Sequence, residues 1–238
     1  MPKINALETG SSQQRDNLNH QAIEDYMKTI FALSQEESPV STSRIAEARE
    51  VKPASATSMI QRLAKLKLVD YAKHYGVTLT PSGKRLALEV IRHHRLLELY
   101  LIEALGFSWD EVHEQADVLE HVISEKLEER IAAALNHPEF DPHGDPIPTK
   151  DGTMPEVETQ PLSMVPENTA VRIARVVDDS NSEMLRYLAG LGLMPGTAVT
   201  LLRVEPFDGP LTVEIGGEQK IIGFNVATSI LVELVSDS

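Results

Sequence analysis

Residues 42–80 carry the pattern that most narrows the fold of this chain. Two short helical patterns, TSRIAEARE and the segment Ser55 to Leu66, are separated by a tight turn at VKP, and Ser41 or Thr42 can cap the first of them. Two β-rich runs joined through a Gly-containing turn, LVDYAKHYGVTLT, follow. The pattern predicts a winged helix-turn-helix. The side chains expected to face inward from its second helix are Met59, Ile60, Leu63 and Leu66.

Charge is divided sharply between two neighbouring segments. Residues 41–95 contain eleven Lys or Arg side chains and four acidic ones, whereas residues 96–141 contain twelve acidic side chains and two basic ones. The formal net charge of −14 therefore hides a basic module beside an acidic one. A basic helix-turn-helix segment is typical of DNA binding, because the protein must neutralise phosphates.

Other patterns predict a chain that is mainly α with a small β domain. Pro81 starts a long helix that reaches about Leu105, and the capping box SWDE opens another, from Trp109 to Leu135. Four short β-rich runs from Pro161 onward and one short helical segment predict an SH3-like β-barrel. The runs are AVRIARVV, AVTLLRV, LTVEIGG and ILVELV, and the helical segment is SEMLRYLAGLG. The predicted domains are a disordered tail (1–18), a winged helix-turn-helix (19–92, with Asn19 as a helix cap), a helical domain (93–142), a proline- and glycine-rich linker (143–160) and the SH3-like domain (161–238).

The absence of cysteine limits the chemistry that the chain can carry. Without thiolates, a metal site must use His, Asp, Glu and backbone oxygens, which favours harder divalent ions. No apolar run approaches the ~20 residues needed to span a bilayer, and the polar start lacks the apolar core of a signal peptide. We therefore expect a cytoplasmic protein with no membrane partner.

Histidine and carboxylate side chains share one face of the predicted helical domain. They are His94, Glu98, His113, Asp117, Glu120 and His121. Two antiparallel helices could bring them together, and Asp25 is the natural contribution of the first helix. Such ligands suit Mn²⁺ or Fe²⁺ better than a structural zinc site.

A solvated acidic helix face is the alternative interpretation, because i, i+4 His/Glu pairs also occur by chance. The candidate ligands flank an apolar stripe instead of spreading evenly, which favours the metal site. The stripe, expected to be core, consists of Val112, Leu119, Val122, Ile123 and Leu127.

The helix after the VKP turn is expected to enter the major groove, where small side chains allow close approach to the bases. The small side chains are Ala54, Ser55, Thr57 and Ser58. The basic side chains expected to contact DNA are Arg44, Lys52, Arg62 and Lys65. A winged helix that binds another protein is the alternative, and the charge division argues against it.

Five segments of the chain are similar to segments of a known family: IEDYMKTIFAL, SRIAEAREVKPASATSMIQRLAKLKLV, LTPSGKRLALEVIRHHRLLELYL, VHEQADVLEHVISEKLEERI and HGDPIP. Through them the chain resembles, over residues 20–236, the diphtheria toxin repressor family of iron- and manganese-dependent regulators. The resemblance implies a homodimer that dimerises through the helical domain and binds double-stranded operator DNA when metal is bound. It implies a primary metal site at Asp25, Asp117, Glu120 and His121 and an ancillary site at His94, Glu98 and His113.

Some residues of this chain differ from the family pattern, and these differences affect which metal ion the site is expected to prefer. Iron-responsive members carry Met and Cys where this chain has Asp25 and Asp117, and the EDY sequence at residues 24–26 is similar to the manganese-responsive branch. Carboxylates harden the site, which favours Mn²⁺, with Fe²⁺ as the alternative. Lys28 stands where that branch has a glutamate, so the number of ions is open.

The barrel of long family members also lends a Glu and a Gln to the ancillary site, and here Asn181 and Met184 occupy those positions. The nearby carboxylates Asp178, Asp179 and Glu183 could replace them. The barrel sequence further resembles a ferrous-transport accessory module that has no catalytic groups.

These features together predict a metal-dependent repressor of metal-transport and homeostasis genes, with no enzyme activity and no small organic substrate. Two alternatives stay open: a hydrolase that uses the His/carboxylate cluster to activate water, and a metal-independent winged-helix adaptor. Alanine at Asp117 and Glu120 would leave DNA binding by an adaptor unchanged.

Overall fold

A computed structural model describes residues 6–177 and 180–234, with side chains from residue 18 onward. The described residues form two compact units. The first contains the chain up to Ile91 together with Lys150–Thr153, and the second contains Arg92–Thr149 together with the chain from Met154 onward. Among the described helices, none is both long and apolar enough to cross a membrane.

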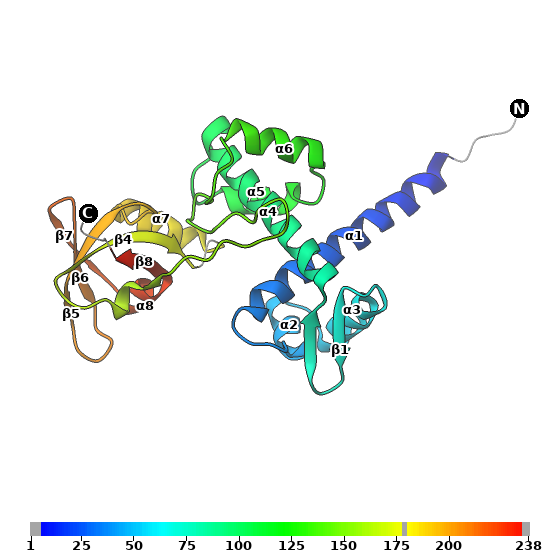
Figure 1. The fold of residues 1–238 in the computed structure, drawn as a ribbon, viewed down its shortest axis with the longest axis horizontal. Helices are drawn as coiled ribbons and strands as arrows, with labels where there is room; N and C mark the ends of the chain where they lie inside the picture. Colours follow the sequence, from blue (N-terminus) through cyan, green and yellow to red (C-terminus); the bar gives the residue numbers. More distant parts are fainter. Residues whose placement is uncertain (1–5, 178–179, 235–238) are drawn as a thin grey trace, which may run out of the picture. The chain divides into compact units, whose positions relative to one another are not determined.

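Helix α1 runs from Ala6 to Ser34 and begins earlier than the sequence predicted (Figure 1). Met27 and Ile30, on its second half, are fully buried in the first unit. Once packing has fixed that half, adding a further turn at the N-terminal end costs little, because helix propagation is much easier than nucleation. The predicted tail and the cap at Asn19 are therefore corrected for residues 6–18, and residues 1–5 lie outside the described part.

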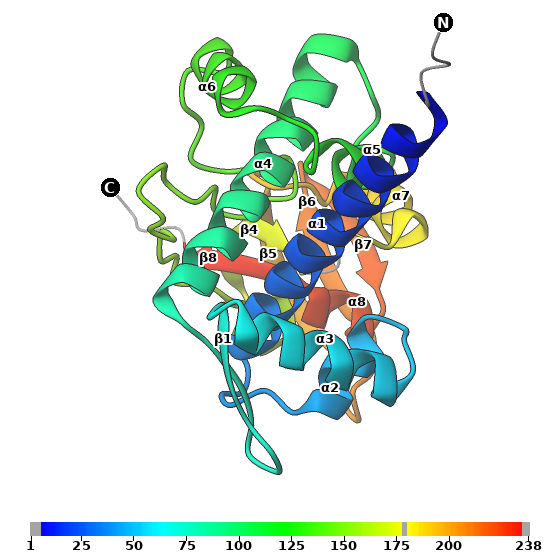
Figure 2. The same ribbon diagram turned by 90° about the vertical axis from the view of Figure 1, so that its right-hand side faces the viewer.

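The helix-turn-helix consists of α2 (Thr42–Ala48) and α3 (Pro53–Lys65), which lie near the C-terminal end of α1 (Figure 2). The Ser41 side chain caps α2 by accepting a hydrogen bond from the Arg44 N–H. Pro53 stands at the start of α3, where its missing N–H is harmless. Ile60 and Leu63 are buried as predicted, whereas Leu66 is half exposed because α3 ends just before it.

The wing is an antiparallel hairpin of β1 (Val69–Ala72) and β2 (Gly76–Leu79). Val40 pairs with Val77 through two backbone hydrogen bonds, which attaches the hairpin to the segment before α2. The predicted winged helix-turn-helix is thus confirmed as the fold of the first unit.

Helix α4 (Pro81–Leu105) is the long helix expected from Pro81, and its course continues from the first unit into the second. The single helix predicted from Trp109 to Leu135 is instead two helices, α5 (Val112–Leu119) and α6 (Glu125–Ala134). The break has a local cause: the β-branched Val122 and Ile123 are weak helix formers, and Ser124 caps α6 by accepting a hydrogen bond from the Leu127 N–H.

The break also changes which apolar side chains are buried. Val112 is buried, but Val122 is 75 % exposed and Leu127 52 % exposed, and Leu119 is also exposed. The prediction that the whole stripe is core is therefore wrong for these three residues. The helical core uses other side chains, namely Leu96, Leu97, Ala116, Ile131, Ala132 and Ile147.

The barrel is a six-stranded antiparallel sheet with strand order β3-β8-β4-β5-β6-β7. Its elements are β3 (Gln160–Pro161), a 3-10 turn (Leu162–Met164), β4 (Thr169–Val176), α7 (Ser182–Leu191), β5 (Ala198–Val204), β6 (Leu211–Ile215), β7 (Glu218–Ile222), α8 (Phe224–Ser229) and β8 (Ile230–Leu234). The sequence predicted β4, β5, β6, β8 and α7. It missed β3, β7 and α8, which are short or lie directly beside another element.

The segment predicted as a linker begins within the core of the second unit. Asp141, His143 and Asp145 are buried although the segment has only an isolated bridge between Phe140 and Pro146. The Trp109 indole donates a hydrogen bond to the Pro142 carbonyl and packs into the apolar core of the barrel. The helical segment and the barrel therefore form one unit, with this loop between them.

Candidate metal centre

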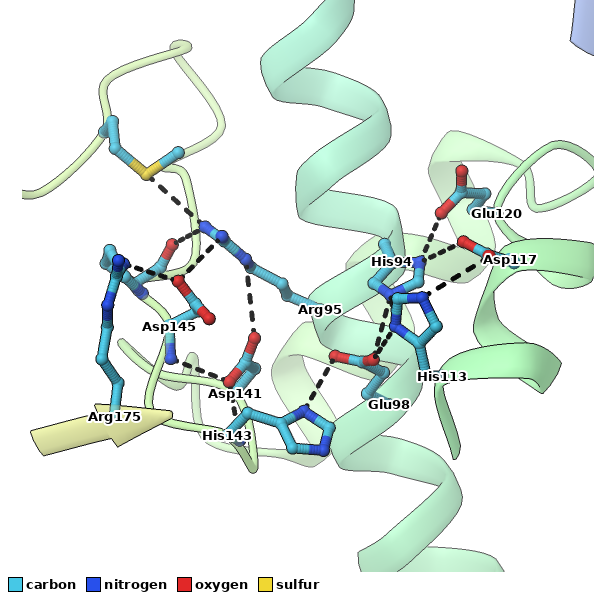
Figure 3. Close-up of polar contacts among 12 residues, drawn as sticks. His94, Arg95, Glu98, His113, Asp117, Glu120, Asp141, His143, Asp145 and Arg175 are labelled. Carbon is cyan, nitrogen blue, oxygen red and sulfur yellow. Dashed lines mark hydrogen bonds and ion pairs between the residues drawn. The ribbon is translucent and has the colours of Figure 1, made fainter. Parts of the chain in front are cut away.

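His94 stands at the centre of the candidate site, between two groups of ligands (Figure 3). Its Nε2 lies 2.9 Å from Glu98 Oε1 and 3.2 Å from His113 Nδ1. Its Nδ1 lies 2.5 Å from Glu120 Oε2 and 3.3 Å from Asp117 Oδ1. The structure thus brings together five of the side chains that the sequence singled out.

Helix geometry explains the convergence. His94 and Glu98 are one turn apart on α4, and His113 and Asp117 are one turn apart on α5. Glu120 is the C-terminal cap residue of α5 and is buried, whereas the Asp117 side chain is about half exposed. Imidazole and carboxylate groups at this spacing can bind a divalent cation, because each offers a lone pair toward the shared space.

Glu98 is the most deeply buried carboxylate of the cluster, with no exposed surface. Burial alone would raise its pKa, but His94, His113 and His143 outweigh burial and hold the pKa well below its usual value. Glu98 is therefore ionised at neutral pH.

His121 lies beside Glu120, with its Nε2 3.5 Å from Glu120 Oε1. Asp25, the fourth side chain expected in the primary site, belongs to the other unit, where its Oδ2 accepts a hydrogen bond of 2.8 Å from Arg49 Nη2. Its participation in the site stays a prediction.

Two buried ligand candidates, Asp141 and His143, were missed by the sequence analysis. The Nδ1 of His143 lies 3.7 Å from Glu98 Oε2, on the opposite side of that carboxylate from His94 (Figure 3). Both residues lie within the short segment DPHGDPIP (141–148), which composition assigns to a linker. The signal that could have revealed them is a pair of ligand-type side chains two apart within a rigid Pro-rich turn.

Three buried atoms of this group have no hydrogen-bond partner among the described residues: Glu98 Oε2, Asp141 Oδ2 and His143 Nδ1. The other polar atoms of the two loop residues are occupied. Asp141 Oδ1 accepts from the backbone N–H groups of His143 and Asp145, and the second ring nitrogen of His143 lies 3.0 Å from the Trp109 carbonyl. Since a carbonyl only accepts, His143 Nε2 carries a proton, and Nδ1 faces Glu98.

The buried charges of this group shift the pKa values of Asp141 and His143. Burial, followed by the charges of Glu98 and Asp145, raises the pKa of Asp141 to about 8. Burial alone would lower the pKa of His143, but Glu98 and Asp141 outweigh it and raise that pKa to about 9. Without a bound cation, the cluster therefore holds protons in its place.

The barrel holds the loop that carries these ligands. The Val176 N–H donates to the His143 carbonyl at 3.0 Å, and Arg175 pairs with Asp145 at 2.8 Å. Gly144 has a φ of +88°, and a Cβ there would lie 1.9 Å from the Ala174 carbonyl oxygen. Only glycine therefore fits where the loop meets β4.

The barrel side chains expected in the ancillary site have separate outcomes. Asp178 and Asp179 lie outside the described residues. Glu183 is exposed in the first turn of α7 and belongs to none of the ligand groups formed by described residues, so its role stays a prediction. Asn181 caps α7 by accepting from the Met184 N–H.

The candidate DNA surface lies on α3 and the turn before it. Lys52, Ala54, Ser55, Ser58 and Lys65 are exposed, and Thr57 is half-buried, its hydroxyl donating to the Pro53 carbonyl. Two of the basic side chains already have partners. Arg62 donates to Asn19 Oδ1 at 2.9 Å, and Arg44 pairs with Glu36 and Glu37.

Comparison with known proteins matches three segments, which together make up most of the chain, to family models. Residues 20–77 match the iron dependent repressor N-terminal DNA binding domain, residues 80–149 its metal binding and dimerisation domain, and residues 160–234 the FeoA domain. The iron-dependent repressor IdeR of Mycobacterium bovis is 30 % identical over 223 residues, which cover 89 % of this chain and 96 % of IdeR.

Solved structures give the same picture. A manganese-dependent transcriptional repressor in complex with manganese is 39 % identical, with a TM-score of 0.81, over 90 % of this chain and all of that one. The manganese regulator SloR is 34 % identical, with a TM-score of 0.71, over 90 % of this chain and 98 % of its own.

Proposed function

Because the chain belongs to the diphtheria toxin repressor family of metal-dependent transcriptional repressors, which are not enzymes, we propose that it is a manganese-responsive repressor of metal-transport and homeostasis genes. The observation that carries the choice of metal is the ligand set around His94, which contains carboxylates and imidazoles and no thiolate. Such a set is hard and suits Mn²⁺, with Fe²⁺ as the second candidate.

The residues divide into two adjoining ligand groups. His94, Glu98 and His113 would hold the ancillary ion, and Glu120, His121, Asp117 and Asp25 the primary ion. Since His94 has a ring nitrogen facing each group, it lies at their junction, and Asp117 also reaches His113 at 3.6 Å. The assignment of Asp117 to one ion or to both is part of the proposal.

Glu98, Asp141 and His143 extend the ancillary site away from His94. Metal-binding histidines almost always donate their second ring N–H to a carbonyl or carboxylate, and His143 faces the Trp109 carbonyl in that way. The three buried atoms make ion-pair contacts at 3.5 Å (Asp141 with Arg95) and 3.7 Å (His143 with Glu98) but no hydrogen bond with the described residues, which is costly unless a proton or cation is shared among them. Their fit to a divalent ion supports the proposal that the loop completes the site.

The proposed switch rests on a difference between two states of the chain. A bound divalent cation supplies positive charge and a fixed ligand geometry. In the metal-free chain the clustered carboxylates repel one another, which opposes closure of the site. Once neutralised, Glu120 and His121 can retain Asp25 of α1, which packs against α2 in the DNA-binding unit. Metal binding would thus favour the DNA-competent arrangement.

A homodimer is part of the proposal, and α5 and α6 offer a surface for it. Val118, Leu119, Val122 and Leu127 are all exposed there, although they are apolar. Several exposed apolar side chains so close together in the sequence favour an interface in this region. The dimer would place two copies of α3 against the two halves of an operator.

The proposal is tested by titrating metal-stripped protein with Mn²⁺, anaerobic Fe²⁺, Zn²⁺ and Mg²⁺ in the presence of a fluorescent duplex. The duplex comes from the upstream region of its own gene or of a metal-transporter gene. We expect Mn²⁺ at micromolar concentration to switch binding on and Mg²⁺ to have no effect. Equal binding with metal and with chelator would contradict the proposal and favour a metal-independent adaptor.

A further inference from the structure

Arg49 makes a contact that the metal site and the DNA surface leave unexplained. Its Nη2 donates to Asp25 Oδ2 at 2.8 Å, although the two residues are 24 positions apart in the sequence. Arg49 and Asp25 are only partly exposed, at 30 % and 23 % of their side chains. The pair lies entirely within the first unit and joins α1 to the end of α2.

The guanidinium is held in a defined orientation. Its central carbon lies 5.6 Å from the centroid of the Tyr26 ring, within the range of a cation–π contact, and Tyr26 itself is buried. Its Nε is buried and has no hydrogen-bond partner among the described residues. Losing Asp25 as well would leave a partly buried cation with no carboxylate, so a movement of Asp25 favours a matching movement of Arg49.

Arg49 also occupies a sensitive position in the helix-turn-helix. It is the C-terminal cap residue of α2, and its backbone N–H donates to the Ile45 carbonyl at 3.0 Å. Glu50 follows with a φ of 51°, and the Val51 N–H closes the turn on the Ala46 carbonyl. The recognition helix α3 begins at Pro53, so a shift of Arg49 is passed through only three residues before it reaches α3.

We propose that Arg49 is a positioning residue that carries the metal-bound state of Asp25 to the turn and to α3. A carboxylate can bind a cation through one oxygen while the other accepts a hydrogen bond, and such outer partners orient the ligand. The inference rests on the proposed function, because it takes Asp25 to be a metal ligand. Its new content is that the link from metal to recognition helix passes through the guanidinium at the end of α2.

The chemistry of arginine fits this task better than that of lysine. The planar guanidinium can donate to Asp25 while its face remains over Tyr26, whereas a lysine ammonium is a point charge on a flexible stem. Removing the guanidinium also removes a positive charge beside a metal ligand, which favours cation binding and offsets the loss of orientation. The variant is therefore expected to keep metal binding and lose the coupling.

The experiment compares the wild type with Arg49→Met and Arg49→Lys. For each we measure the ratio of operator affinities with saturating Mn²⁺ and with chelator, and the number of Mn²⁺ ions bound by equilibrium dialysis. Coupling in such systems is typically about 5–150-fold. We expect the Arg49→Met ratio to fall at least about tenfold, or to unity where the wild-type ratio is smaller, with unchanged Mn²⁺ stoichiometry, and Arg49→Lys to restore little of it.

Amide hydrogen exchange gives a readout that does not depend on DNA. Mn²⁺ is expected to slow exchange of residues 49–56 in the wild type and to leave it unchanged in Arg49→Met. Arg203→Met is the control, because it removes the same guanidinium from the surface of the second unit, where Arg203 pairs with Glu205 at 3.1 Å. Its affinity ratio and its metal-induced protection should equal those of the wild type.

The outcomes separate the two proposals. If the wild type binds operator equally with and without metal, the proposed function fails. If the wild type switches and Arg49→Met switches to the same extent, with the same protection of residues 49–56, the proposed function stands and the role of Arg49 is overturned. Circular dichroism of Arg49→Met in chelator verifies that its helices are intact.

Discussion

Asp25 and Glu98 are both candidate metal ligands, but their surroundings are opposite. Glu98 is fully buried, and the imidazoles of His94, His113 and His143 lie around it within one compact unit. Asp25 is partly exposed and accepts a hydrogen bond from the Arg49 guanidinium at 2.8 Å. The comparison indicates that the Glu98 region is a preformed cluster. The contact between Asp25 and Arg49, in contrast, can be exchanged for another partner.

The largest difference should appear when the two carboxylates are neutralised one at a time. We expect Glu98→Gln to lower the free energy of unfolding in chelator by about 3 kcal/mol, because it leaves buried histidines without their anion. Asp25→Asn should cost under about 1 kcal/mol, because its partner is also partly exposed to solvent. Urea denaturation of both variants checks this, and equal losses would contradict the division between the two regions.

The same two variants should differ in function. Asp25→Asn is expected to fold normally and to lose most of the Mn²⁺-induced gain in operator affinity, a loss of about 5–150-fold if the coupling is of ordinary size. Fluorescence anisotropy with saturating Mn²⁺ and with chelator measures this gain. A full response from Asp25→Asn would remove Asp25 from the metal site.

Gly144 tests whether the Glu98 region is preformed by the barrel. Gly144→Ala should destabilise the second unit by at least about 2 kcal/mol, because the left-handed conformation alone costs about 1–2 kcal/mol and the new Cβ meets the Ala174 carbonyl. Gly106→Ala is the control, since Gly106 has a φ of +73° but open space around it. Thermal unfolding should rank the control as the milder variant, and equal effects would show that the close approach to β4 is unimportant.

The metal-free Glu98 region should also respond to pH. The pKa of His143 is raised from 6.5 to about 9, so its contribution to stability is fully present below pH 6.5 and is lost as the pH rises through 9. Asp141, with its pKa raised to about 8, has the same sign, because the folded state binds the extra proton. We therefore expect the stability in chelator to fall from about pH 4, where the contribution of Asp141 begins to be lost, to about pH 9, where that of His143 is gone, and a flat profile would show that neither pKa is raised.

The smallest effect concerns the DNA surface near the Asp25 region. Arg62→Ala should reduce the slope of log affinity against log salt by about 1 without altering sequence preference, if Arg62 exchanges its contact with Asn19 for a phosphate. Binding measured at four salt concentrations gives the slope. An unchanged slope would mean that Arg62 keeps Asn19 as its partner on DNA.

Much of the fold was readable from local patterns. The turn at VKP, the wing and the strands β4, β5, β6 and β8 are set by spacing and turn chemistry, which act within a few residues. The errors arose where neighbouring signals competed: Ser124 divides the helix expected from Trp109 to Leu135, and α1 extends beyond the expected cap at Asn19. Local rules give the kind of element more securely than its ends.

The residues of the candidate site were likewise predicted only where local spacing was informative. His94, Glu98, His113 and Asp117 were identified because helical spacing places ligand-type side chains on one face. Asp141 and His143 were assigned to a linker, since nothing in a Pro- and Gly-rich composition shows that such a segment is buried. Arg49 was noted only as a positive charge, because its partner Asp25 is 24 residues away.

The sequence by itself determined the chemistry of this protein: the absence of thiolates, the basic helix-turn-helix, and the acidic helices with histidines at ligand spacing. Only the tertiary structure decided which of the charged and ligand-type side chains come into contact. It places His94 between two ligand groups, joins Asp141 and His143 to Glu98, and pairs Arg49 with Asp25. The physical reason is that residue type and period are local properties, whereas burial and pairing arise only when distant segments pack together and exclude water.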